Sequence, residues 1–140
     1  MSKISDELRQ KVAQVAKYRC GYCLMPQSII PMPLEIEHIL AQAEGGTDDE
    51  DNLWLACRAC NSHKHAKIHG FDLVTNQEVK LFNPRTQIWK EYFEYDFKTG
   101  EIIGKTACGR ATVATLRMNE EQAVKARLLW VKSGWYPPED

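Results

Sequence analysis

Apolar residues recur at the spacing of one helix face in two stretches of the chain: Leu8, Val12 and Val15, and Val124, Leu128 and Val131. The first stretch follows Ser5, whose hydroxyl suits a helix N-cap, so we predict a helix that ends before Cys20. The second follows Asn119, with Gln122 three residues later as in a capping box, and it precedes Gly134. We therefore predict a last helix that begins at Asn119 and ends at Gly134.

Three elements are predicted between these helices in the first half of the chain. Alternation of apolar and polar residues predicts a strand at 34–39, and the short apolar run 53–57 indicates a second strand. A short helix is expected from Arg58 to about Ile68, because Gly70 ends the pattern. Two segments are expected to be loops, because prolines, glycines or clustered acids interrupt any periodicity: 24–33 and 41–51.

The second half shows a different pattern. Residues 71–79 carry no clear periodicity, so we expect an irregular segment there. Aromatic and polar residues alternate over 89–97, and the turn sequence 98–100 leads into 101–104, which indicates a β-hairpin. The aromatic side chains are expected to form a hairpin core or to cover a helix, with stacking on nucleic-acid bases as the alternative.

The length of 140 residues suits one domain, or one core with a small extension. Helices and strands are mixed without internal repeats, so the fold class is predicted to be α+β. We expect a core at residues 1–70, which holds the first helix, and an extension at residues 71–140, which packs on it.

Composition and charge narrow the class of protein. Hydrophobic residues make up 44% of the chain and the formal net charge is −1, which excludes a disordered charged tail. The sequence pI of about 6.4 lies below the usual basic footprint of a nucleic-acid-binding domain. The first residues are polar, and no run approaches the ~18 apolar residues of a membrane helix, so we expect a cytoplasmic protein without membrane contact.

The five cysteines include two closely spaced pairs. Cys20-x-x-Cys23 and Cys57-x-x-Cys60 are separated by 33 residues. Two such turns supply the four thiolates of a closed, tetrahedral zinc site, so we predict one structural Zn²⁺. The alternatives are a redox-active dithiol at one pair, or four unrelated buried cysteines. Cys108 is left over and is expected to be a small buried side chain.

The segment between the two pairs concentrates residues that suit acid–base and metal chemistry. Glu37 and His38 are adjacent at a strand end, where a carboxylate for a hard divalent cation can lie beside a general base. Asn52 follows an acidic turn, and Asn61 lies near the start of the predicted helix, directly after Cys60. Three of these residues also have a structural explanation when taken alone: Asn52 as a turn former, His38 as a structural histidine and Asn61 as a helix cap.

Taken in order, these residues resemble the HNH endonuclease superfamily, the ββα-metal nucleases. The resemblance covers roughly 18–67, about a third of the chain, and its matching elements are Cys20-x-x-Cys23, Glu37-His38-Ile39, Gly45-Gly46, Asp51-Asn52-Leu53 and Cys57-x-x-Cys60-Asn61-x-x-Lys64. The second half resembles an extension of some small, free-standing bacterial HNH proteins. The resemblance implies a ββα-metal, treble-clef-like core with structural zinc, followed by the hairpin and helix extension.

The resemblance also implies a metal-dependent endonuclease that hydrolyses DNA phosphodiester bonds. His38 corresponds to the general base, and Glu37 and Asn61 to the ligands of one divalent cation. Asn52 corresponds to the central Asn that holds the metal loop and His38 in register. Oxygen ligands favour Mg²⁺ or Mn²⁺ as the catalytic cofactor. His63 is a spare candidate for the cation or a phosphate.

The expected substrate is DNA, most simply double-stranded, bound by a monomer or a homodimer. Basic residues around the helix are candidates for phosphate contacts: Arg58, Lys64 and Lys67. Three arginines of the second half are either further phosphate contacts or ordinary surface residues: Arg85, Arg110 and Arg117. Two other classes of function stay open, a non-catalytic, zinc-stabilised nucleic-acid-binding module and a zinc-stabilised protein-interaction domain.

Overall fold

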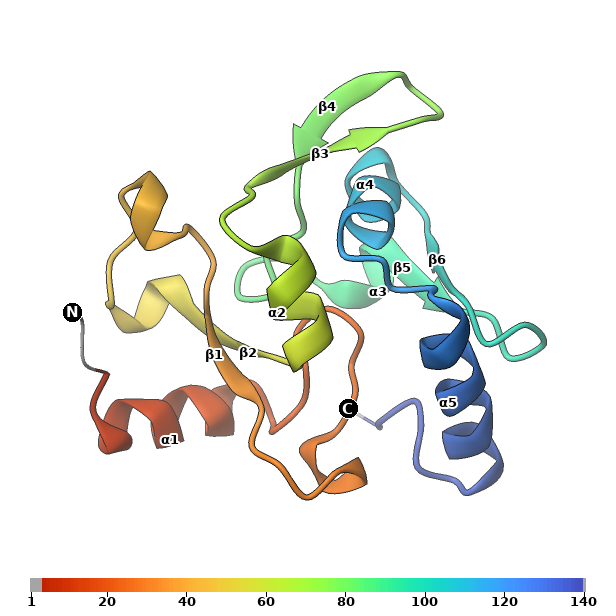
Figure 1. Cartoon of the computed structure of the whole chain (residues 1–140), viewed down its shortest axis with the longest axis horizontal. Helices are drawn as coiled ribbons and strands as arrows, with labels where there is room; N and C mark the ends of the chain where they lie inside the picture. Colours follow the sequence, from red (N-terminus) through yellow and green to blue (C-terminus); the bar gives the residue numbers. More distant parts are fainter. Residues whose placement is uncertain (1–3, 140) are drawn as a thin grey trace.

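The computed structural model describes residues 4–139 (Figure 1). Residues 1–3 of the predicted core and residue 140 of the predicted extension lie outside the described part. The α-helices and strands follow in this order: α1 Asp6–Val15, β1 Glu35–His38, β2 Leu53–Ala56, α2 Arg58–Lys64, β3 His69–Asp72, β4 Gln77–Lys80, α3 Trp89–Tyr92, β5 Phe93–Tyr95, β6 Ile102–Gly104, α4 Ala107–Thr115 and α5 Glu121–Lys132. Single 3-10 turns lie in the loops: η1 Gln27–Ile29, η2 Gln42–Glu44 and η3 Glu50–Asn52. The mixture confirms the predicted α+β class.

The first half contains the predicted ββα unit. β1 and β2 pair antiparallel, with Glu37 opposite Trp54 and His38 opposite Leu53. α2 follows β2 directly, and it lies in the centre of the molecule between this sheet and α4 (Figure 1). α2 ends at Lys64, several residues earlier than predicted, because His65 has a positive φ of 52° that a helix cannot continue.

The predicted first helix is confirmed, including its cap. The Ser5 hydroxyl accepts a hydrogen bond from the Leu8 amide at 3.1 Å. α1 contacts β2 and buries Val12 completely. The helix therefore covers the sheet that carries Glu37 and His38.

The second half corrects three sequence-based expectations. Residues 71–79 are not irregular, since β3 and β4 form an antiparallel hairpin over most of this segment. Residues 89–92 form the short helix α3, so the confirmed hairpin of β5 and β6 begins only at Phe93. α4 was not predicted, because its sequence is rich in small residues and lacks an apolar stripe. It packs by close approach instead, with Gly109 against the backbone of Tyr92.

The start of α5 is also shifted. Glu120 is the N-cap residue, and the side chain of Asn119 bonds to β6 instead. Its Oδ1 accepts from the Ile102 amide at 2.8 Å, and its Nδ2 donates to the Ile102 carbonyl at 2.9 Å. Asn119 therefore joins α5 to the hairpin rather than capping the helix.

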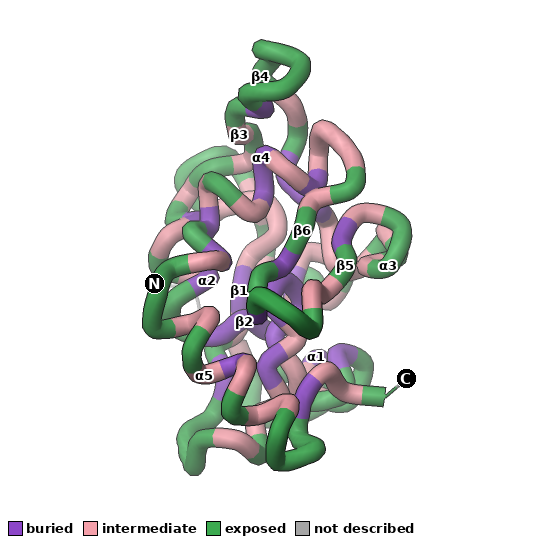
Figure 2. The backbone as a smooth tube through the Cα atoms, turned by 90° about the vertical axis from the view of Figure 1, so that its right-hand side faces the viewer, coloured by how far each residue is buried: buried purple, intermediate pink, exposed green. Residues whose placement is uncertain are grey.

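The predicted boundary at residue 70 falls inside β3, and one cluster of buried residues runs through both halves. The cluster includes Tyr22 and Leu55 from the first half, and Phe82, Phe93 and Leu116 from the second. Figure 2 shows buried backbone through the middle of the molecule, whereas the outer end of the β3–β4 hairpin is exposed. Within residues 4–139, no helix is both long and apolar enough to cross a membrane.

Candidate functional site

The four cysteines of the two pairs meet in one buried cluster. Their sulfur atoms all lie within 4.8 Å of one another, and Cys23 Sγ lies 3.8 Å from Cys57 Sγ. That separation is far longer than the ~2.05 Å of a disulfide bond. Backbone amides point at two of the sulfurs, since Cys23 N lies 3.5 Å from Cys20 Sγ and Cys60 N lies 3.4 Å from Cys57 Sγ.

The cluster fits a zinc ion. In a tetrahedron with Zn–S bonds of about 2.3 Å, adjacent sulfurs are about 3.8 Å apart, which is the spacing seen between Cys23 and Cys57. Hydrogen bonds with the neighbouring cysteines, of which the one with Cys20 has the largest effect, lower the pKa of the Cys57 thiol. A hydrogen bond with Cys20 raises the pKa of the Cys23 thiol. The geometry supports the predicted structural zinc site at all four positions.

Glu37 lies on β1, where its buried carboxylate contacts two side chains, one of them from α2. Tyr22 Oη donates to Glu37 Oε2 at 2.9 Å, and Lys64 Nζ lies 2.7 Å from Oε1. Glu37 is 1% exposed and Lys64 2% exposed, so the ion pair is closed to solvent. Burial raises the pKa of Glu37 more than the Lys64 ammonium lowers it.

The position of Lys64 therefore corrects the expectation that this residue contacts a phosphate, because its ammonium is buried. Besides Glu37, its ammonium donates to the carbonyl oxygens of His38 at 3.2 Å and Ile39 at 3.1 Å. All three N–H groups can be used inside the protein. In this position the lysine stabilises the end of β1 instead of facing DNA.

His38 points to a different partner, because successive side chains on a strand face opposite sides. Its Nε2 lies 2.7 Å from Asp48 Oδ1, in the acidic loop between β1 and β2. The His38 side chain is 22% exposed, so it is held by the protein and still reached by water. A carboxylate-held imidazole of this kind is suited to proton transfer near neutral pH.

Asn52 ties the two ends of this loop together. Its Oδ1 accepts from the Leu40 amide at 2.8 Å, and its Nδ2 donates to the carbonyls of Leu40 at 2.9 Å and Thr47 at 2.8 Å. Leu40 lies two residues after His38, and Thr47 directly precedes Asp48. The amide therefore holds the loop that faces His38.

Asn61 lies on α2 and hydrogen-bonds Glu35 rather than Glu37, with its Nδ2 2.9 Å from Glu35 Oε1. Within residues 4–139, the four cysteines form the one group of three or more Cys, His, Asp or Glu ligand atoms close enough to share an ion. Glu37 and Asn61 still offer carboxylate and amide oxygens, the donor types of a hard cation. A carboxylate has about four acceptor positions, so Glu37 keeps capacity beyond Lys64 and Tyr22.

The remaining predicted site residues are His63, Arg58 and Lys67. His63 turns toward the second half, where its Nδ1 lies 2.9 Å from the Leu116 carbonyl oxygen, so it joins α2 to the end of α4. Arg58 is exposed at the start of α2, and Lys67 is exposed after its end. Lys67 lines an open hollow of about 420 Å³ together with His65, His69, Glu44 and Glu78.

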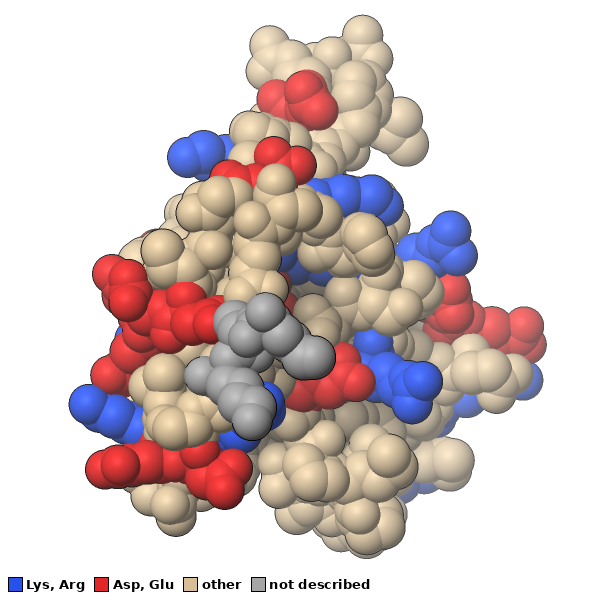
Figure 3. Space-filling model, turned by 60° about the vertical axis from the view of Figure 1, so that its left-hand side comes forward, with Lys and Arg blue, Asp and Glu red and all other residues tan. Residues whose placement is uncertain are grey.

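The surface has no single charge character on the face that Figure 3 presents. Lys and Arg side chains are scattered there among Asp and Glu rather than gathered into one band. This agrees with the net charge of −1. Two of the candidate arginines have internal partners: Arg85 lies 5.0 Å from the centre of the Trp54 ring, and Arg110 pairs with Asp72 at 2.9 Å.

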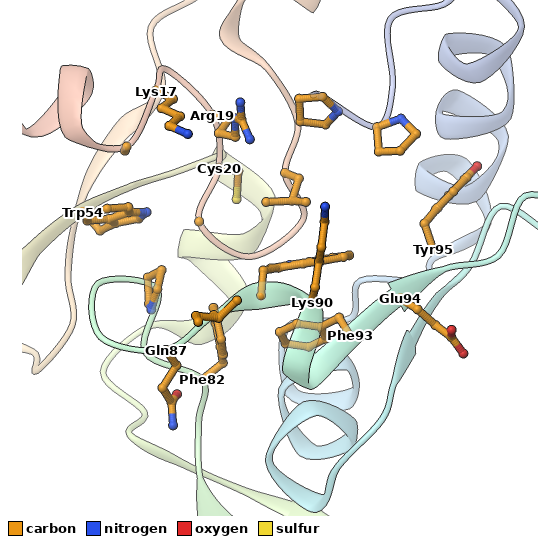
Figure 4. A pocket seen from close by; sticks show the side chains of 18 of the residues that line it. Lys17, Arg19, Cys20, Trp54, Phe82, Gln87, Lys90, Phe93, Glu94 and Tyr95 are labelled. Atoms are coloured by element: carbon orange, nitrogen blue, oxygen red, sulfur yellow. The ribbon is translucent and has the colours of Figure 1, made fainter. Parts of the chain in front are cut away.

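A larger, aromatic hollow of about 500 Å³ lies beside the first cysteine pair (Figure 4). Trp54, Phe93 and Tyr95 are among the side chains around it. Phe93 is 1% exposed, and the Trp89 indole N–H donates to the Tyr22 carbonyl at 2.7 Å. These aromatic residues thus pack the second half onto the zinc-site segment, as the core interpretation expected.

Sequence reasoning missed two residues of the site. Tyr22 lies inside the first cysteine pair and is bonded to Glu37, but nothing local in the sequence links them. Asp48 belongs to the acidic run 48–51, for which the sequence predicts only a turn-rich loop. Its position in the loop that joins the His38 strand to its neighbour was the available signal, because such a loop returns toward the strand end.

Comparison with known proteins agrees with the geometry. Residues 20–67 match the family model described as HNH endonuclease. Neither the curated proteins nor the solved structures gave a match. The matched segment begins at the first zinc-type cysteine and contains β1, β2 and α2. This match suggests a nuclease-type function on nucleic acid. With its ββα unit and four-cysteine cluster, the segment 20–67 of this chain is similar to a domain of the HNH endonuclease family.

Proposed function

We propose that the chain is a metal-dependent endonuclease that hydrolyses DNA phosphodiester bonds, with His38 as the general base. The observation that carries the proposal is the His38–Asp48 contact of 2.7 Å at a solvent-accessible strand end, within the segment that matches the family. A nuclease needs a group that removes a proton from water near neutral pH, and an imidazole fixed by a carboxylate is well suited to this.

Glu37 and Asn61 are proposed to hold one Mg²⁺ or Mn²⁺ ion. When bound, such a cation supplies Lewis-acid stabilisation of the negative charge on the scissile phosphate. Glu37 is 1% exposed and already paired with Lys64, so a bound cation would have to displace the Lys64 ammonium and open this buried site. Asn61 Nδ2 is used by Glu35, and the amide oxygen is the atom proposed to face the cation.

The other residues have supporting roles in this proposal. Asn52 holds the loop around His38, and the four-cysteine zinc site joins the start of α2 to the turn at residues 20–23. Exposed Arg58 and Lys67 are the proposed contacts to flanking phosphates. The proposed substrate is double-stranded DNA in a reducing cytoplasm, where a monomer would nick one strand and a homodimer could cut both.

Incubation of supercoiled plasmid with each divalent cation tests the proposal, with the wild type beside His38→Ala. We expect cleavage by the wild type with Mg²⁺ or Mn²⁺, none after chelation by EDTA, and at least about a 100-fold loss in the variant. Zinc content and melting temperature of His38→Ala should match the wild type, because the side chain is partly exposed. Full activity of His38→Ala would contradict the base assignment.

A gel-shift measurement with the same DNA separates the alternative function. Wild-type protein that binds DNA and cleaves it with no tested cation would favour the non-catalytic, zinc-stabilised binding module. We expect instead binding and cleavage together, and binding that weakens as salt rises because phosphate contacts release counterions.

A further inference from the structure

The side chains of His38 and Asp48 form a short, partly buried contact, unlike the loose ion pairs of an exposed surface. The two side chains are 22% and 27% exposed, and the Nε2–Oδ1 distance is 2.7 Å, short for a bond between nitrogen and oxygen. Gln42 Nε2 donates to the same Oδ1 at 3.0 Å, so the carboxylate is oriented as well as bound. The imidazole is therefore held in one ring orientation.

An ionised carboxylate only accepts hydrogen bonds, so it places the imidazole proton on Nε2. The neutral ring then carries its lone pair on Nδ1, which becomes the basic nitrogen. In other enzymes a buried carboxylate selects the tautomer of a catalytic histidine in this way and stabilises the imidazolium that forms.

The Asn52 side chain holds the backbone on either side of the contact between Asp48 and His38. The Asn52 side chain bonds the carbonyl of Thr47, which precedes Asp48, and both backbone groups of Leu40, two residues after His38. One amide thus fixes the chain on both sides of the contact. The central Asn of the motif consequently acts on His38 through the position of Asp48.

We propose that Asp48 is the positioning residue of the general base, which rests on the nuclease function proposed above. Asp48 fixes the Nε2–H tautomer of His38, so Nδ1 accepts the proton of the attacking water. The water oxygen forms a bond to phosphorus while the bond from phosphorus to the 3′ oxygen breaks. The carboxylate stabilises the resulting imidazolium until its proton passes to solvent, and the leaving oxygen takes a proton from solvent.

The tautomer can be measured without any activity. Long-range ¹H–¹⁵N correlation spectra of the zinc-loaded protein identify the protonated nitrogen of each of the four histidines, and the spectrum of His38→Ala assigns the His38 signals. We expect the Nε2–H form in the wild type and a mixture of forms in Asp48→Asn. A wild-type His38 in the Nδ1–H form would overturn the proposal.

Kinetics on plasmid DNA provide the second test, with Asp51→Asn as the matched control. Asp51 is an exposed acid of the same loop, and its replacement makes the same change in charge. We expect Asp48→Asn to lower kcat about 10- to 100-fold with KM unchanged, and Asp51→Asn to keep the wild-type kcat. Adding Asp48→Asn to His38→Ala should cause no further loss, because Asp48 acts through His38.

The outcomes distinguish this inference from the proposed function. An inactive His38→Ala together with wild-type kcat in Asp48→Asn would overturn the positioning role and leave the nuclease proposal standing. Full activity of His38→Ala would overturn the nuclease proposal itself. Equal losses in Asp48→Asn and Asp51→Asn would show a general effect of loop charge and would also overturn the positioning role.

Discussion

Replacing Lys64 with methionine should test the buried ion pair most directly. The variant removes the ammonium 2.7 Å from Glu37 Oε1 and leaves a side chain of similar length. At an effective dielectric constant of about 20, the lost attraction is about 6 kcal/mol. Protonation of Glu37 limits the cost, because carrying a proton at pH 7 on a carboxyl with an ordinary pKa of about 4.3 requires about 3.7 kcal/mol.

We therefore expect Lys64→Met to lower the free energy of unfolding by about 3–4 kcal/mol at pH 7, within the usual range for a broken buried pair. The loss should shrink as pH falls. Burial raises the pKa of Glu37, and without Lys64 the folded variant binds a proton that the unfolded chain releases above about pH 4.3. Stability relative to the wild type should thus recover as pH falls from 7, by at most about 1.4 kcal/mol for each pH unit.

Urea unfolding at fixed zinc concentration measures this effect at several pH values. Lys67→Met is the control, because it removes an exposed cation from the same segment and should change stability by less than about 0.5 kcal/mol. Adding Glu37→Gln to Lys64→Met should restore part of the loss, since glutamine is neutral without the free-energy cost of protonating a carboxylate at pH 7. A Lys64→Met variant as stable as the wild type, or a loss that does not vary with pH, would refute the reasoning.

Three further predictions concern the zinc site, the packing beside it and the β3–β4 hairpin. Native mass spectrometry should find about one zinc per chain, and Cys57→Ser should lose it; a folded, metal-free wild type would contradict the site. Gly21→Ala should lower stability by about 1–3 kcal/mol in thermal unfolding, because the new Cβ would overlap the Trp54 indole; an unchanged melting temperature would oppose this packing. Arg110 lowers the pKa of Asp72, so this pair stabilises the folded state at neutral pH and the benefit is lost as pH falls below about 4. Urea unfolding of Asp72→Asn should therefore show lower stability at pH 7 and a smaller decline with acid than the wild type, and parallel declines would contradict it.

The differences between prediction and structure share a physical cause. Residues 71–79 form a hairpin whose tip is organised by Asp72, which accepts from the amides of Val74 and Thr75 and pairs with Arg110, 38 residues away. α4 buries small residues by close backbone approach, which leaves no apolar periodicity to detect. Such elements depend on partners distant in sequence, and local patterns do not record those partners.

Local spacing by itself determined the first helix, the ββα order, the four zinc-type cysteines and the position of His38 at a strand end. These features depend on neighbours within a few residues, since caps, strand alternation and two-residue ligand turns are short-range properties. The tertiary structure alone decided what faces each site residue. It brought Lys64 inside to Glu37, turned His63 toward α4 and placed Asp48 on His38, because burial and charge compensation act between segments that meet only after the chain has folded.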